Sequence, residues 1–117
     1  MPEKQFKLRP DEFRSLALGR GGCYATDHIT VDGHRVGYMY REQPGVGFFD
    51  SGWRFFSGLE SDDYANNADN IAIYDVNTIA NYDPEIIPLL DAPLWSAFAR
   101  DCKTGKFVEE AFCPPEG

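Results

Sequence analysis

Short runs of β-branched and aromatic residues, broken by glycine, proline and aspartate, constrain this fold more than any other feature. The clearest case is Asp32-Gly33, which separates residues 28–31 from residues 34–40. Asp-Gly between two β-rich runs is a strong signal for a two-residue hairpin turn. Further strand candidates are residues 23–26, 71–74 and 94–98. Because the helix signals between them are short, we expect an α+β fold: an antiparallel β-sheet with hairpins and short peripheral helices.

The expected helices begin at local capping signals. A Ser or Asp side chain accepts a hydrogen bond from a free N–H group of the first turn, and proline suits the first helical position. The predicted starts are Pro10, Ser61, Asp75 and Asp83-Pro84-Glu85. Gly19 is expected to end the first helix, and Pro88 to restrict the last one to about one turn.

The aromatic run of residues 48–56 has two arms around Gly52. It predicts a second hairpin, or a loop that leads into a strand. In a strand, Trp53 and Phe55 face one side and Arg54 faces the other. Core packing accounts for these rings, whereas an exposed aromatic patch beside acids is typical of a protein-binding hot spot. Arg54 is predicted to pair with surrounding acids and rings.

Charge is distributed unevenly along the 117 residues. Residues 1–41 hold seven Lys/Arg and five Asp/Glu, a net of +2, while residues 42–117 hold four and fourteen, a net of −10. Between Arg54 and Arg100 there are eight acids and no Lys, Arg or His. The total of −8 argues against nucleic acid and anionic membranes as direct partners. The acidic stretch is either a solvated face or a surface that steers a basic partner.

The motifs predict no catalytic residue, metal site or cofactor. In the predicted hairpin, His28 and His34 lie on opposite faces, and Asp27, which shares a face with His34, lies four residues or roughly 13 Å along the strand from it, so we expect no metal site there. Residues 60–70 lack the ligand pattern of a calcium-binding loop. The chain has neither a GxSxG sequence nor a glycine-rich nucleotide motif. A pair of Cys23 with one histidine stays an alternative, although nothing in the sequence places them in contact.

The length of 117 residues fits one domain, and cysteine usage and the lack of long apolar segments indicate a cytoplasmic protein. Cys23, Cys102 and Cys113 are odd in number and widely spaced. This is typical of reduced thiols that are buried or idle, while a Cys102–Cys113 disulfide stays open. We find no leader sequence, and the apolar cluster at residues 86–90 is too short to cross a bilayer.

Several runs in a fixed order resemble one bacterial family. The most distinctive are Gly22-Cys23-Tyr24-Ala25-Thr26-Asp27-His28, Asp50-Ser51-Gly52-Trp53-Arg54-Phe55-Phe56 and Asn70-Ile71-Ala72-Ile73-Tyr74-Asp75. This series is similar to the family called domain of unknown function 2185, or immunity-protein-33-like. The resemblance covers residues 22–101. It divides the single domain into an N-terminal helix and turn (1–21), this core, and a C-terminal extension (102–117).

The resemblance implies a cytosolic antitoxin that neutralises a secreted toxin in the producing cell. It implies no catalytic residues. We therefore expect a non-enzymatic immunity protein whose acidic surface occludes the active site of a toxin, for instance a basic nuclease-like one. The predicted partner-binding residues are Asp62, Asp63, Asp69, Tyr74, Asp75, Tyr82, Asp83 and Asp91.

Two other hypotheses stay open. One is a small enzyme or ligand-binding domain that uses Cys23, His28 or His34 beside an aromatic cleft. The other is an intracellular scaffold module that has no toxin partner. A bound metal or ligand would favour the first, and a gene without a toxin neighbour would favour the second.

Overall fold

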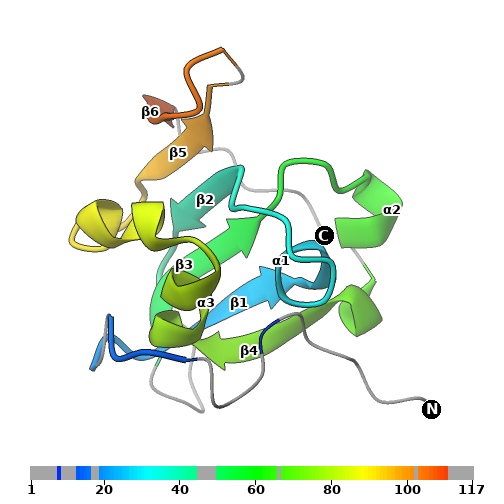
Figure 1. Cartoon of the computed structure of the whole chain (residues 1–117), viewed down its shortest axis with the longest axis horizontal. Helices are drawn as coiled ribbons and strands as arrows, with labels where there is room; N and C mark the ends of the chain where they lie inside the picture. The colour runs from blue at the N-terminus through cyan, green and yellow to red at the C-terminus, as the bar shows by residue number, and fades with distance from the viewer. Residues whose placement is uncertain are drawn as a thin grey trace.

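A six-stranded β-sheet runs through the described part of the protein (Figure 1). The computed structural model describes residue 8 and residues 13–16, 19–44, 50–65, 67–101 and 103–110. The strands lie in the order β4-β1-β3-β2-β5-β6. They are β1 (Gly22–Thr26), β2 (Tyr38–Arg41), β3 (Asp50–Phe56), β4 (Ile71–Asp75), β5 (Ala97–Arg100) and β6 (Phe107–Glu110). This sheet with a few short helices confirms the predicted α+β class.

The sheet is mixed rather than wholly antiparallel. β1 runs parallel to β3, with Tyr24 beside Arg54 and Ala25 beside Phe55, whereas the other neighbouring strands are antiparallel. The antiparallel prediction is therefore wrong for the β1–β3 pair. Parallel strands need a crossover connection. Here the chain passes through the short helix α1 and strand β2 before it reaches β3.

The helices of the described chain are all short. They are α1 (Asp27–Thr30), α2 (Asp62–Ala65), η2 (Ala68–Asn70), α3 (Val76–Tyr82) and η3 (Pro84–Leu89). Ser61, Asp75 and Asp83 each accept a hydrogen bond from a backbone N–H two or three residues later, which confirms these predicted helix starts. Among the described residues, no helix is both long enough and apolar enough to span a membrane.

The predicted hairpin at Asp32-Gly33 does not form. Instead α1 makes one helical turn, and β2 begins only at Tyr38. The Asp32 N–H bonds back to the Asp27 carbonyl at 3.0 Å, and Gly33 has a φ of +79°. Gly33 thus lets the chain leave a helix rather than reverse between strands. A hairpin turn and the end of a helix both use the left-handed backbone that glycine allows, so the Asp-Gly dipeptide alone does not distinguish them.

Both ends of the described chain differ from the prediction. Residues 13–16 are not helical, so the first predicted helix is wrong where the structure describes it. The last predicted strand, residues 94–98, is shifted to Ala97–Arg100 because its first two residues form a turn. The sequence did not indicate β6. The aromatic arm at residues 48–49 and the Cys102–Cys113 pair lie outside the described residues.

The main core lies on the sheet face that α3 and η3 cover (Figure 1). Trp53 and Phe55 of β3 point into it, whereas Phe56 packs with Tyr40 on the opposite face. The predicted alternation along this strand is confirmed. The fully buried side chains of the main core include Cys23, Ala25, Ile29, Met39, Trp53, Phe55, Val76, Ile79 and Ile86.

Arg54 is buried and holds two carboxylates. Its Nη1 and Nη2 donate to both oxygens of Asp50, at 2.9 and 2.8 Å, and its Nε donates to Glu42 at 2.6 Å. Its guanidinium carbon lies 4.6 Å from the centre of the Tyr24 ring. The predicted pairing of Arg54 with acids and rings is confirmed.

Gly52 forms an irregularity within β3 rather than a turn between two arms. Its φ is +89°, and a Cβ there would lie 2.3 Å from the Glu42 carbonyl oxygen, so only glycine fits. The Asp50 carboxylate accepts from the Gly52 N–H at 2.9 Å. The same carboxylate therefore secures both the irregular backbone and Arg54.

Candidate partner-binding surface

The predicted partner-binding residues do not form one continuous surface. Asp69 lies two residues before β4 and Asp75 is the last residue of that strand, so the strand, with end residues roughly 13 Å apart, separates them. Asp62 and Asp63 begin α2, next to η2. Asp91 lies two residues after the end of η3.

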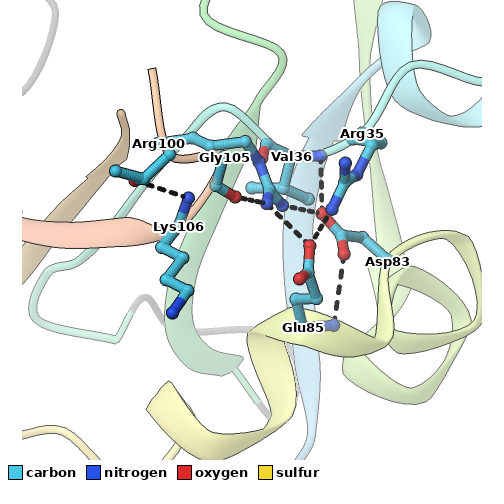
Figure 2. A network of polar contacts seen from close by, with 8 residues as sticks. Arg35, Val36, Asp83, Glu85, Arg100, Gly105 and Lys106 are labelled. Carbon is cyan, nitrogen blue, oxygen red and sulfur yellow. Dashed lines mark hydrogen bonds and ion pairs between the residues drawn. The ribbon is translucent and has the colours of Figure 1, made fainter. Parts of the chain in front are cut away.

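Asp83 is buried within the fold. Its side chain is 2% exposed, and its Oδ2 accepts from Arg100 Nη2 at 2.5 Å and from the Val36 N–H at 3.0 Å. Figure 2 shows that Arg100 contacts both Asp83 and the neighbouring Glu85, that the Val36 N–H also points at Asp83, and that Arg35 contacts Glu85 alone. A carboxylate enclosed by these donors holds η3 to β5 and is not presented to a partner. We therefore leave Asp83 out of the binding surface.

Tyr74 and Tyr82 direct their hydroxyl groups toward Thr30 in α1. The Tyr74 hydroxyl lies 3.0 Å from Thr30 Oγ1, and the Tyr82 hydroxyl donates to the Thr30 carbonyl at 2.9 Å. Both rings are half-buried. These contacts join α1 to β4 and α3, so a structural role accounts for both tyrosines.

Asp75 and Asp91 are exposed, and each also makes a local bond. Asp75 caps α3 through the Asn77 N–H at 2.8 Å. The Asp91 carboxylate lies 2.5 Å from Arg20 Nη1, and this bond lowers the pKa of Asp91. The ion pair offsets the charge of Asp91, so this aspartate adds little to any long-range attraction of a basic partner.

Asp63 and Asp69 are exposed on α2 and η2. Asp27 and Asp32, which were not among the predicted residues, lie at the same end of the molecule. Burial raises the pKa of Tyr64 on α2, and the negative charges of these two aspartates raise it further, which places them close to that ring. We call Asp27, Asp32, Asp63, Asp69 and Tyr64 the acidic end. The charge pattern did not indicate Asp27 and Asp32, because they lie in the mildly basic N-terminal third. Only the helical turn that replaces the predicted hairpin brings them to α2.

Beneath the acidic end lies a polar cluster centred on Glu60, whose side chain is 4% exposed. Glu60 accepts from Thr26 Oγ1 at 2.5 Å and from the N–H groups of Ser57 and Gly58 at 2.8 and 2.9 Å. Burial alone would raise the pKa of Glu60, but these hydrogen bonds outweigh burial and lower it. Glu60 thus stays ionised and fixes the loop that leads into α2.

His28 joins this cluster from α1. Its Nδ1 lies 2.9 Å from Ser57 Oγ and 3.7 Å from Glu60, and its ring lies 4.2 Å from that of Tyr64. The ring of His34, predicted on the opposite face of a hairpin, is only 5.6 Å away. The prediction that the histidines lie apart is therefore wrong, because it assumed the hairpin register.

The arrangement around His28 does not resemble a catalytic triad. In a triad, the nucleophile and the orienting acid meet different nitrogens of the histidine. Here Ser57 and Glu60 both face Nδ1. Cys23 is fully buried in the apolar core, and burial raises the pKa of its thiol, which keeps it protonated and weakly nucleophilic. Neither group is prepared for nucleophilic attack.

Small hollows lie on the described part of the protein. One, of about 230 Å³, is lined in part by Arg20, Arg41 and Trp53. Another, of about 320 Å³, lies between η3 and the β5–β6 edge and is lined in part by Leu89 and Phe107. Ligand pockets typically measure about 300–1,000 Å³, so both are at or below the small end of that range. No three His, Cys, Asp or Glu of the described chain are grouped to hold a metal ion.

The comparison with protein families gives one match. The family model described as Immunity protein Imm33 domain matches residues 23–111, which are 89 of the 117 residues. The chain belongs to the Imm33 immunity-protein family. No curated protein and no solved structure matches it.

The Imm33 region takes in almost the whole described sheet, from the second residue of β1 to the end of β6. The predicted resemblance to immunity-protein-33-like proteins is confirmed, and the match continues beyond residue 101, where the predicted resemblance ends. Membership of the Imm33 family supports an immunity role and, in general terms, a protein partner.

Proposed function

We propose that this Imm33 protein is a non-enzymatic antitoxin that binds a bacterial toxin in the cytoplasm of the producing cell and blocks the toxin's active site. The observation that carries the proposal is the family match over residues 23–111. Inhibition by occlusion requires a surface and no chemistry. This agrees with the unreactive environments of Cys23 and His28.

The acidic end is the surface we propose for the first contact with a basic toxin, such as a nuclease. It groups four carboxylates from α1, the following turn, α2 and η2. In the described residues of this end, no Lys or Arg forms an ion pair with Asp32, Asp63 or Asp69. Unpaired exposed carboxylates attract a cationic cleft and raise the association rate, an effect that salt suppresses.

The test is inhibition and binding of the toxin encoded beside this protein. We expect Asp63→Lys together with Asp69→Lys to slow association about tenfold or more at low salt, with a smaller effect at high salt. Glu109→Lys together with Glu110→Lys is the matched control, since it makes the same charge change on exposed β6. Equal slowing by both double variants would remove the acidic end from the proposal. If the wild-type protein fails to bind or inhibit the toxin, the antitoxin proposal itself is wrong.

A further inference from the structure

The turn between η3 and β5 holds a tryptophan in a conformation that large side chains avoid. Trp95 has a φ of +71° and is the one non-glycine residue with positive φ among the described residues. A bulky side chain in this region strains the backbone, and glycine would not. Such strain persists only where surrounding bonds enforce it, and it is concentrated at functional positions.

Arg41 enforces this conformation. Its carbonyl accepts from the Trp95 N–H at 2.6 Å, its N–H donates to the Ser96 carbonyl at 2.9 Å, and its Nη1 donates to the Ala92 carbonyl at 2.7 Å. Arg41 is itself fixed, because its Nε donates to the Ser51 carbonyl at 2.9 Å. The turn is therefore tied to the sheet on both sides of its tip.

The tip that results is apolar and faces solvent. Pro93, Leu94 and Trp95 are consecutive exposed residues, with 54% of Trp95 and 38% of Leu94 accessible. The other tryptophan, Trp53, is 1% exposed. Isolated exposed apolar residues are ordinary, but a rigid exposed tryptophan that directly follows an exposed proline and an exposed leucine is unusual. Tryptophan is among the most enriched residues at binding hot spots, and a rigid one loses little conformational entropy on binding.

We propose that residues 93–95, the Trp95 tip, anchor this protein to its toxin by inserting the Trp95 ring into an apolar pocket on the toxin surface. This inference rests on the proposed function. An exposed tryptophan that follows an exposed proline and leucine is complementary to a pocket lined by apolar side chains. The acidic end then accelerates encounter, and the Trp95 tip slows dissociation.

Affinity for the toxin encoded beside this protein tests the tip. Trp95→Gly removes the ring and supplies a residue that adopts a φ of +71° freely, so the turn is kept. We expect this variant to bind at least about 30-fold more weakly, mainly through faster dissociation, while its circular dichroism spectrum shows that the fold is kept. Val108→Ala is the matched control, since Val108 is 50% exposed on β6, and its affinity should stay within about twofold.

A second measurement observes the ring itself. With 5-fluorotryptophan incorporated, the two tryptophans give two ¹⁹F signals, and the one missing in Trp95→Phe belongs to Trp95. Binding of unlabelled toxin should shift the Trp95 signal and protect it from a soluble paramagnetic agent.

The outcomes separate the two levels of the proposal. If the wild-type protein binds the toxin and Trp95→Gly binds equally well with an unprotected ¹⁹F signal, the tip is not the anchor while the antitoxin function stands. A ¹⁹F shift that depends on this protein's concentration without toxin would assign the tip to self-association and overturn the inference. If the wild-type protein does not bind the toxin, both the antitoxin function and the role of the Trp95 tip are refuted.

Discussion

Replacing Arg54 with methionine should destabilise the protein strongly. Methionine has a similar length but no charge, so Asp50, whose side chain is fully buried, keeps only the Gly52 N–H among the donors described above. The substitution removes four guanidinium hydrogen bonds, three of them to carboxylates, and the contact with the Tyr24 ring. Although burial opposes ionisation, the bonds to Asp50 and Glu42 raise the pKa of Arg54, in agreement with a tightly held pair.

Removing one member of a buried ion pair costs about 3–5 kcal/mol, because the other charge stays buried without compensation. Domains of this kind are stable by about 5–15 kcal/mol in total. We therefore expect Arg54→Met to lower the free energy of unfolding in urea, followed by circular dichroism, by about 3–5 kcal/mol. Arg35→Met breaks an exposed pair with Glu85 and should cost about 0–1 kcal/mol.

The double variant Asp50→Asn/Arg54→Met gives the decisive comparison. It removes both charges, so it should recover at least about half of the loss. The reasoning would be refuted if Arg54→Met cost no more than Arg35→Met, or if neutralising Asp50 in the Arg54→Met background recovered nothing.

Two further predictions concern buried ionisable groups. Since hydrogen bonds lower the pKa of Glu60 below its ordinary value of 4.5, the stability it contributes is present above that value and is lost as the pH falls through the folded-state pKa. Glu60→Gln should therefore reduce the difference in unfolding free energy between pH 7 and pH 3, and an unchanged difference would contradict the role of Glu60. Cys23, whose thiol pKa is raised by burial, should resist iodoacetamide at pH 8 in the folded protein and react in urea, as peptide mass spectrometry would show; equal labelling in both states would contradict its burial.

The features that the sequence predicted correctly depend on near neighbours along the chain. Asp75 and Asp83 cap helices through N–H groups two residues away. Trp53 and Phe55 share a face because every strand alternates. Arg54 could be assigned to acids and rings because burial of an arginine requires such partners.

The features that the sequence could not predict depend on distant parts of the chain. Gly33 ends a helix because of how α1 packs against the sheet, and nothing in Asp-Gly itself excludes a hairpin. The parallel β1–β3 pair joins segments about 30 residues apart, with no local signal. For the candidate surface, sequence alone could not separate buried Asp83 from exposed Asp63, since both are aspartates at the start of a predicted helix.

The position of β1 inside the sheet, with a neighbouring strand on each side, affects when this protein can become active during its synthesis. β1 lies between β3 and β4, and Gly22 pairs with Asp75, which is translated 53 residues later. At about 5–20 residues per second, β1 waits about 3–10 s for its second neighbour. Sheets built from such distant pairings also fold slowly. A toxin made at the same moment would therefore meet an unfinished inhibitor, and protection of the cell would require this protein to be translated first.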